Sequence, residues 1–275
     1  MMKKVNLYEN SEFIVTKTAY MPKVAELYDA VMAFSLRTGG CSSAPYESLN
    51  FSSMNGDTET NVSKNFQILS DYLGIESSRI ITCDQEHGDN VVILDHPPET
   101  SLKADAIIAT NSGLYPAIKT ADCLPILIID PTVKIAAAVH AGWRGAVLRI
   151  LRKVILILSE DYQCEKDNLI VALGPAIGSC CYEVDQIVLE PLFSAIPWAM
   201  KFTKPPDTAF KHSSGKRHLD LVAINHHELV RLGIPSRNIH SAQICTSCSK
   251  DMHYSFRRDG KSSGRGLAIT GFKPN

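Results

Sequence analysis

The sequence lacks an excess of charge of either sign and lacks a long hydrophobic run. Lysine and arginine number 28 against 29 aspartates and glutamates in 275 residues, whereas nucleic-acid-binding domains usually carry a basic excess. The most apolar segment, AVLRILRKVILIL (146–158), holds three charges and is too short to cross a bilayer. We therefore expect neither nucleic acid nor a membrane to be a partner.

The first residues, MMKKVNLYENSEF, include two lysines but no apolar stretch behind them, so they do not resemble a secretory signal. Eight cysteines in a chain without an export signal are better interpreted as reduced thiols than as disulfides. We therefore expect a cytoplasmic protein in which some thiols are metal ligands or nucleophiles.

No internal repeat, low-complexity tract or long linker interrupts the chain. Short apolar runs rich in β-branched residues predict buried strands, at 79–83, 90–95, 124–130, 134–139 and 168–173. Helical patterns occupy 61–74, 146–158 and 219–233, and the first and last end at a glycine. In the middle helix, Arg149, Arg152 and Lys153 should share one face. These patterns predict an α/β (α+β type) fold: one domain over 1–275, with a mixed β-sheet core flanked by helices.

The stretch ADCLPILIIDPTVKIAAAVHAGWRG (121–145) predicts an antiparallel hairpin, because a turn sequence beginning Asp-Pro joins two apolar runs. If the loop is Pro131-Thr132, the numbers of opposed residues sum to 263, which places Cys123 opposite His140. Opposed residues share a face of the sheet. A thiol and an imidazole would then lie side by side at the open end of the hairpin.

Three interpretations of this pair are open. Cys123 can be an ordinary buried thiol beside a hydrogen-bonded His140, the two can bind zinc with a third ligand, or they can form a nucleophilic dyad. The next residues favour a functional site: a glycine-bounded turn leads into a helix near Arg144, where backbone N–H groups and a guanidinium would attract an anion. Trp143 could stack on a ring.

Several motifs resemble one family in the order in which they occur. They are FSLRTGGCSSAPYESLNFS (34–52), GDTETNVSKN (56–65), QEHGDNV (85–91), TADCLPILIID (120–130), AAAVHAGWRG (136–145), LGPAIGSCCYEV (173–184), HLDLVAIN (218–225) and YSFRRDGKSSGRGLAIT (254–270). Together they are similar to the laccase-domain, or multicopper polyphenol oxidase-like, family. That family includes bacterial purine nucleoside phosphorylases and the peptidoglycan editing factor.

The resemblance implies a zinc site formed by His87, Cys123 and His140; nothing in the residue pattern alone selects His87. It implies phosphorolysis of adenosine, inosine and methylthioadenosine, with adenosine deamination as a second activity. The metal ligands would also be catalytic. Phosphate and nucleoside would be the small-molecule partners, and the implied residues around them are Arg37, Asn50, Arg144, Arg257 and Arg258. Glu86 and Asp89, beside His87, could tune the site from outside the ligand set.

Other interpretations remain at this stage. Glu183 is either a catalytic acid/base group or a surface carboxylate. For Cys180-Cys181, a role as buried structural thiols is favoured over a role as nucleophiles. Cys245 and Cys248 form a CxxC motif, which is half of a four-cysteine zinc site. The only candidate for the other half is Cys180-Cys181. Two adjacent cysteines bind one metal ion poorly, so such a site is disfavoured.

The alternatives for function are a Cys123–His140 amide hydrolase acting on a peptidoglycan precursor, a non-enzymatic metal-binding or partner-binding protein, and a copper-dependent polyphenol oxidase. Copper is the alternative ion, because a His₂Cys set can bind it. A multicopper oxidase uses His-x-His pairs, and none of the nine histidines is so spaced, which disfavours oxidation as the main activity. The chain is expected to be a monomer or homodimer.

Overall fold

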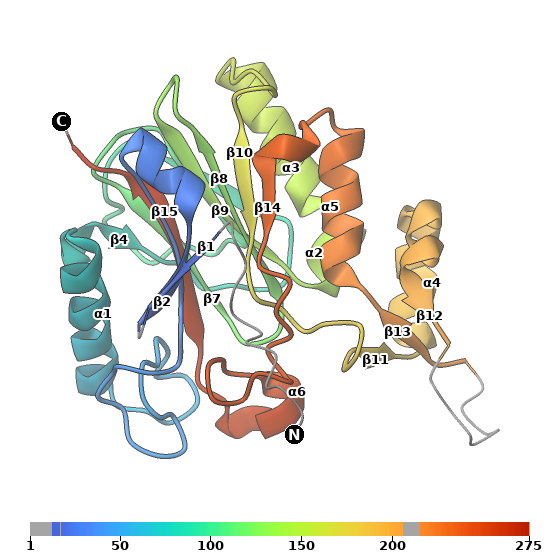
Figure 1. The fold of residues 1–275 in the computed structure, drawn as a ribbon, viewed down its shortest axis with the longest axis horizontal. Helices are drawn as coiled ribbons and strands as arrows, with labels where there is room; N and C mark the ends of the chain where they lie inside the picture. Colours follow the sequence, from blue (N-terminus) through green and yellow to red (C-terminus); the bar gives the residue numbers. More distant parts are fainter. Residues whose placement is uncertain (1–12, 17, 206–214, 275) are drawn as a thin grey trace, which may run out of the picture.

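The computed structural model describes residues 13–16, 18–205 and 215–274. Two six-stranded sheets stack face to face, and helices cover both outer faces (Figure 1). Helices long and apolar enough to span a membrane are absent from these described ranges. The expected α/β architecture of mixed sheet flanked by helices is confirmed.

The strands divide between the two sheets in a way that the sequence did not indicate. The first sheet has the order β1 (Phe13–Val15), β2 (Ala19–Pro22), β3 (Ala30–Ser35), β15 (Gly266–Phe272), β7 (Tyr115–Thr120) and β4 (Ile80–Ile81). The second has the order β14 (Ile239–Ser241), β10 (Ile170–Leu173), β8 (Leu124–Asp130), β9 (Ile135–Ala141), β6 (Ala106–Ala109) and β5 (Val91–Leu94). Both are mixed: β4–β7, β5–β6 and β10–β14 are parallel, and the other described pairs are antiparallel.

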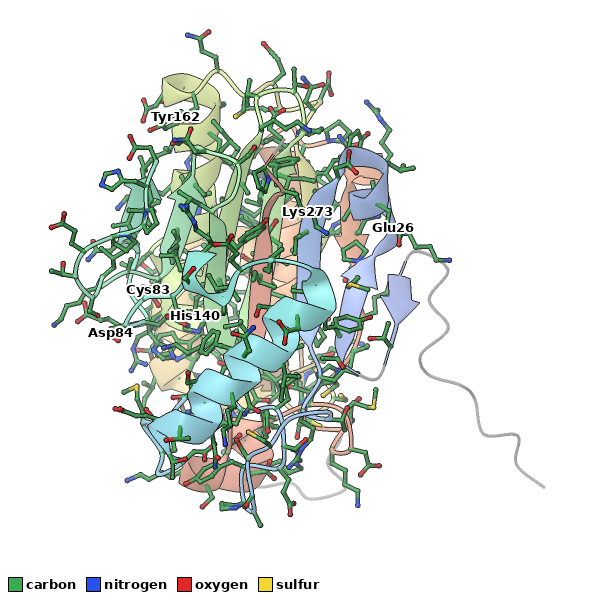
Figure 2. All side chains as sticks on the ribbon, turned by 90° about the vertical axis from the view of Figure 1, so that its left-hand side faces the viewer. Glu26, Cys83, Asp84, His140, Tyr162 and Lys273 are labelled. Carbon is green, nitrogen blue, oxygen red and sulfur yellow. The ribbon has the colours of Figure 1, made fainter. Side chains whose placement is uncertain are left out.

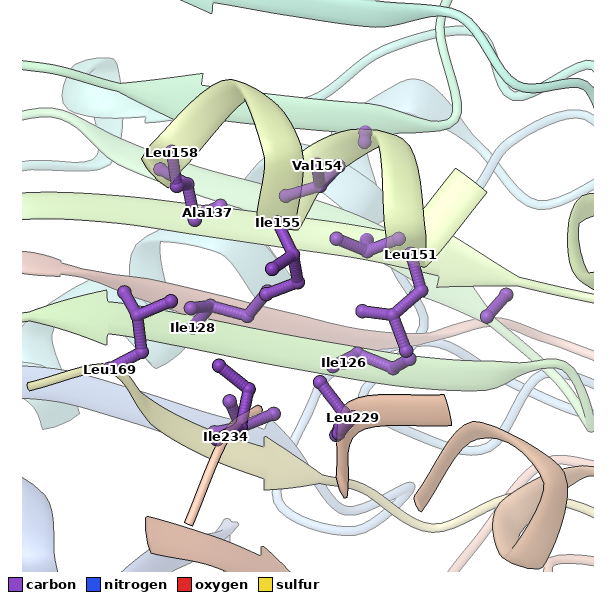
Figure 3. Close-up of a cluster of buried hydrophobic side chains, with 14 of the residues drawn as sticks. Ile126, Ile128, Ala137, Leu151, Val154, Ile155, Leu158, Leu169, Leu229 and Ile234 are labelled. Atoms are coloured by element: carbon purple, nitrogen blue, oxygen red, sulfur yellow. The ribbon is translucent and has the colours of Figure 1, made fainter. Parts of the chain in front are cut away.

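Strands β6, β8 and β10 of the second sheet are almost wholly apolar because both of their faces are buried. In β8, Leu127 and Ile129 pack between the sheets, whereas Ile126 and Ile128 pack against the helices outside (Figure 3). Strand β9 is buried throughout and carries a run of alanines, Ala136–Ala138.

On the outer face of the first sheet lies α1 (Glu59–Leu73). The Thr58 side chain caps its start by accepting a hydrogen bond from the Asn61 N–H, and Gly74 ends it with a φ of 66°, as the terminal glycine predicted. The second sheet is covered by α3 (Ile150–Leu156) and α5 (Leu221–Arg231). Leu151 and Ile155 of α3 and Leu229 of α5 meet β8 in this layer (Figure 3).

The single helix expected over 146–158 is wrong in one respect. The chain forms α2 (Trp143–Val147) and then α3, and Arg149 separates them with a φ of 62°. Arg149 therefore leaves the face expected to hold Arg152 and Lys153, and its Nε donates to the Glu228 carboxylate at 3.0 Å. This ion pair explains why a charged residue interrupts an otherwise apolar segment.

A smaller unit lies to the side of the two sheets, beyond α5 in the view of Figure 1. It consists of the sheet β11–β13–β12 (Glu183–Val184, Arg217–Leu219 and Thr203–Lys204) and α4 (Gln186–Ala195). Helix α6 (Phe256–Asp259) lies below the sheets in the same view. Short 3-10 helices occupy Lys23–Tyr28, Ser77–Arg79, Pro197–Phe202, Ser236–Asn238 and Gly260–Ser262, and a π-helical turn occupies Ile157–Asp161.

Candidate metal centre

The hairpin exists, but its register differs from the expected one. Asp130 pairs with Ile135 across a longer turn, 131–134, so Pro125 opposes His140 and the expected Cys123–His140 opposition is wrong by two positions. The Asp130 side chain holds this turn by accepting the Thr132 N–H at 2.8 Å. A shift of two residues leaves every side chain on its original face. Cys123 and His140 therefore still converge, as diagonal neighbours.

Cys123 lies on the segment that carries the chain from β7 of the first sheet into β8 of the second, and His140 is on β9. His87 arrives from the loop between β4 and β5. The ligand atoms of the three residues all lie within 4.8 Å of one another. His140 is buried, Cys123 is half-buried and His87 is exposed, so the cluster opens to solvent on the His87 side.

Asp105, which the sequence analysis did not identify, holds two of these ligands in place. Its Oδ1 is 2.8 Å from His140 Nδ1, and its carboxylate accepts the backbone N–H groups of His87 and Gly88 at 2.9 and 2.7 Å. These bonds stabilise the left-handed backbone of His87, which has a φ of 59°. Burial raises the pKa of Asp105, but His140 and the N–H groups together hold it below its ordinary value.

The rest of the His87 loop is fixed by Gln85. Its side-chain amide donates to the Lys119 carbonyl at 2.8 Å, and its side-chain oxygen accepts the Lys119 N–H at 2.7 Å. The two acidic neighbours suggested by the sequence form ion pairs with lysines: Glu86 with Lys103 at 3.2 Å and Asp89 with Lys153 at 3.1 Å.

Charges within the cluster favour a thiolate. Burial alone would raise the pKa of Cys123, but the charges and hydrogen bonds of His140 and His87 lower it to about 6. Burial would lower the pKa of His140, but Cys123 and Asp105 raise it to about 9. The thiolate is both the metal-binding and the nucleophilic form of cysteine.

The donor set fits a transition metal ion. Because the Asp105 carboxylate accepts a hydrogen bond from His140 Nδ1–H, Nε2 is the ring nitrogen left to bind a metal ion, which would displace its proton. Two imidazoles and one thiolate are a three-ligand set that suits zinc and leaves a position for solvent or substrate. Gly142 provides the space: a Cβ there would lie 3.0 Å from the Cys123 sulfur and 3.5 Å from the His87 ring.

A cavity of about 500 Å³ surrounds the cluster, within the range typical of small-molecule sites. Its walls come from both sheets, the smaller unit and α6: Ser52, Met54, Asp84, Gln85, His87, Lys119, Thr120, Ala121, Asp122, Cys123, His140, Ile177, Tyr182, Leu221, Phe256, Arg257 and Arg265. His140 and Asp84, which both line this cavity, lie near the same end of the strands in Figure 2. Lys119, Arg257 and Arg265 are the cationic side chains of the lining, and Asp84 and Asp122 are its carboxylates.

The residues expected to contact substrate divide into two groups. Arg257 lines the cavity, where its guanidinium lies over the Tyr182 ring at 5.2 Å. Arg37 donates to the carbonyls of Glu47 and Lys250, each at 2.9 Å, and is not among the lining residues.

Asn50 and Arg258 also lie outside the lining. Asn50 is fully buried and accepts the Arg265 N–H at 2.8 Å, so it supports a cavity residue from behind. Arg258 donates to the Thr246 carbonyl at 2.9 Å and to the His253 carbonyl at 3.0 Å.

The two remaining predicted residues lie at the surface near the cavity. Arg144 is exposed and covers the Trp143 ring, with its guanidinium carbon 4.5 Å from the ring centre. Glu183 is half-buried in β11 and pairs with Lys216 at 2.8 Å. Neither belongs to the cavity lining.

Sequence reasoning missed Asp105, Lys119 and Arg265. Arg265 falls within the motif YSFRRDGKSSGRGLAIT (254–270), which also holds the predicted residues Arg257 and Arg258, so a signal for it was present. Lys119 directly precedes the TADCLPILIID motif and lies near the end of β7, so its place beside the motif is its sequence signal. Asp105 precedes a short strand, and no local pattern distinguishes it.

The model of the family described as multi-copper polyphenol oxidoreductase laccase matches residues 31–273. The chain belongs to this family of laccase-like domains. It is 31% identical over 254 residues to purine nucleoside phosphorylase YlmD of Geobacillus stearothermophilus, covering 88% of this chain and 90% of that protein. It is also 31% identical over 255 residues to adenosine deaminase RL5 of an unknown prokaryotic organism, covering 88% and 94%.

Solved structures show the same fold. Bacillus licheniformis hypothetical protein YfiH superposes with a TM-score of 0.87 at 27% identity, covering 96% of this chain and all of that one. YlmD of Geobacillus stearothermophilus gives a TM-score of 0.83 at 28% identity, covering 96% and 99%. Relatives named as a purine nucleoside phosphorylase and as an adenosine deaminase thus match this chain over most of its length.

Proposed function

We propose that the chain is a zinc-dependent purine nucleoside phosphorylase. It would convert adenosine, inosine and methylthioadenosine to free base and pentose 1-phosphate, and would also deaminate adenosine. The observation that carries the proposal is the convergence of His87, Cys123 and His140 at a cavity that also holds cationic side chains. The proposed enzyme is one cytoplasmic catalytic domain over 1–275.

In phosphorolysis, a phosphate oxygen forms a bond to C1′ of the ribose while the bond from C1′ to the purine nitrogen breaks. Lys119, Arg257 and Arg265 are the cavity's cations for the attacking phosphate. Tyr182 and Ile177 offer apolar surface for the base. Bound zinc would supply a Lewis acid with a coordination position open to solvent or substrate.

The direct test is incubation of the zinc-loaded protein with each nucleoside and phosphate, followed by assay of free base and pentose 1-phosphate. Omitting phosphate and assaying inosine formed from adenosine measures deamination separately. Cys123→Ala should lose the zinc ion of this site and both activities while keeping its circular dichroism spectrum, because Cys123 lines the cavity and is only half-buried. Absence of product with all three nucleosides, or full activity in Cys123→Ala, would refute the proposal.

One observation favours a second candidate, the Cys–His amide hydrolase. A Cys123 thiolate beside His140, with Asp105 on the far ring nitrogen, is also the arrangement of a nucleophilic triad. Metal content separates the two functions, because a thiolate bound to zinc is not free to attack an amide. Tight zinc binding through Cys123 favours the phosphorylase, and activity on an amide only in metal-free protein favours the hydrolase.

A further inference from the structure

Four cysteines that the proposed function does not use meet at the surface. Cys180 and Cys181 lie in the turn between β10 and β11, and Cys245 and Cys248 lie in the turn after β14. Their sulfur atoms all lie within 4.8 Å of one another. Two of the four are adjacent in the chain, and this adjacency disfavours the grouping when the sequence is considered alone. The structure brings them together.

The spacing of the sulfur atoms suits a shared metal ion. Cys248 Sγ is 3.4 Å from Cys181 Sγ and 3.6 Å from Cys180 Sγ. Four thiolates bound tetrahedrally at about 2.3 Å from zinc would lie about 3.8 Å apart. The observed separations are close to that edge length, and they are well above the roughly 2.05 Å of a disulfide bond.

The cluster does not belong to the apolar core. Cys180 and Cys248 are exposed, and Cys181 and Cys245 are only half-buried, so burial of small apolar side chains does not explain why four thiols gather here. Gly178 keeps the space between the turns open: a Cβ at this position would lie 3.1 Å from the Cys245 Cβ and 3.3 Å from the Cys180 sulfur. The Gly178 N–H also donates to the Cys245 sulfur at 3.3 Å, as suits a sulfur that carries negative charge.

Backbone hydrogen bonds hold the two turns in register. The Thr246 N–H donates to the Ala176 carbonyl at 3.0 Å, and the Ala176 N–H donates to the Ile244 carbonyl at 3.2 Å. Arg258 braces the second turn through the Thr246 and Ser247 carbonyls, at 2.9 and 3.2 Å. The thiols therefore meet without requiring the chain to rearrange.

We propose that Cys180, Cys181, Cys245 and Cys248 bind a second zinc ion, which joins the two turns. Four soft thiolate donors select zinc over hard cations such as magnesium or calcium. The site is separate from the cluster of His87, Cys123 and His140.

This site would stiffen one wall of the cavity. Asp122, next to Cys123, accepts the Thr246 hydroxyl and the Arg257 N–H, each at 2.6 Å, and its carbonyl accepts the Ile177 N–H at 2.9 Å. Thr246 belongs to one cysteine-bearing turn, and Ile177 leads into the other. The ion would therefore fix the segments that position Cys123 and Arg257.

Metal counting on the full chain tests the proposal without reference to activity. Protein expressed with added zinc and purified under reducing conditions should contain about two zinc ions per chain by mass spectrometry of the metal, one for each cluster. Cys180→Ser/Cys248→Ser replaces one exposed ligand from each turn and should lower the count to about one. Cys123→Ala should also lower it to about one, and the combined variant should bind almost none.

Cys41→Ser is the matched control, because Cys41 is an exposed cysteine outside both clusters and should keep both ions. Cobalt substitution gives an independent reading: thiolate-to-cobalt charge-transfer absorption of a four-sulfur site should persist in Cys123→Ala and disappear in Cys180→Ser/Cys248→Ser. If the latter variant is unfolded by circular dichroism, Cys248→Ser alone replaces it.

One zinc per chain in the wild type, lost in Cys123→Ala, would overturn the proposal. So would a second zinc that survives in the folded cysteine variants. An intact mass lower by two hydrogen atoms without reductant, together with a single zinc, would instead assign the cluster to a disulfide.

Discussion

The His140 ring and the Asp105 carboxylate lie against each other in the core, with Nδ1 2.8 Å from Oδ1, and both residues are almost completely buried. The His140 backbone N–H also donates to the Asp105 carbonyl at 2.7 Å. One aspartate thus sets the position and the orientation of a metal ligand, while its remaining bonds shape the loop that carries His87.

Asp105→Asn should therefore weaken zinc binding by about 10- to 100-fold, the usual effect of losing such a supporting contact. The amide keeps the size of the carboxylate but removes its charge and one acceptor. The measurement is competition for zinc against a chelating dye of known affinity.

Asp89→Asn is the matched control for this variant, because Asp89 is closer to His87 in sequence yet pairs with Lys153. Its zinc affinity should stay within about twofold of the wild type. Equal affinities in Asp105→Asn and the wild type would show that Asp105 does not support the metal.

The sequence was sufficient for the face of the hairpin but not for its register. The turn was expected to contain Pro131 and Thr132 alone, but the Asp130 side chain caps a longer turn in which Lys134 has a φ of 59°. Lys134 carries no sequence signal for that conformation. The conclusion about Cys123 and His140 was unaffected because the error was an even number of residues.

Contacts between distant segments could not be predicted in this way. His87 came only from the family resemblance, and Asp105 was missed, because both depend on how the loop before β5 folds onto the start of β6. The four cysteines meet because Ala176 and Cys245 form an isolated bridge between two turns. A single sequence does not encode such pairings in any local pattern.

Gly142→Ala should impair the metal centre while sparing the fold. Gly142 has a φ of −73° and ψ of 177°, which alanine adopts readily, but the added Cβ would approach the Cys123 sulfur to 3.0 Å. Displacing one ligand by a fraction of an ångström should lower activity by about 10- to 100-fold.

Zinc content, activity and the melting temperature are measured together for this variant. Gly145→Ala, three positions later, is the control, because the added Cβ would lie 3.2 Å from the Ile150 side chain and 3.4 Å from the His140 carbonyl oxygen, and would approach no ligand side chain. It should alter stability more than zinc binding. Wild-type activity in Gly142→Ala would mean that the sulfur is not held where the structure places it.

Lys119→Gln should raise the KM for phosphate by about 10- to 100-fold, the effect of removing a charge-assisted hydrogen bond. The fold should be spared, because Gln85 bonds to the Lys119 backbone and not to its side chain. Deamination of adenosine, which consumes no phosphate, should change little.

Arg37→Gln gives the contrasting result, because the Arg37 guanidinium is bonded to the carbonyls of Glu47 and Lys250. It should reduce the free energy of unfolding and leave the phosphate KM nearly unchanged. A raised KM for phosphate in Arg37→Gln, with an unchanged KM in Lys119→Gln, would instead identify Arg37 as the phosphate ligand.

His253 should make stability depend on pH. Burial, with the nearby charge of Arg258, lowers its pKa to about 4, against 6.5 in the unfolded chain. Between these values the unfolded state binds a proton that the folded state does not. The free energy of unfolding therefore falls as pH decreases from 6.5 to about 4, and this group does not affect it above 6.5.

His253→Gln removes the titration. Denaturation in urea at pH 7.5 and pH 5 should show the wild type losing about 1 to 2 kcal/mol more than the variant, as one proton at roughly 1.4 kcal/mol per pH unit requires. Parallel losses in the two proteins would mean that His253 titrates normally, and the buried Nε2, which has no hydrogen-bond partner among the described residues, would then have access to water.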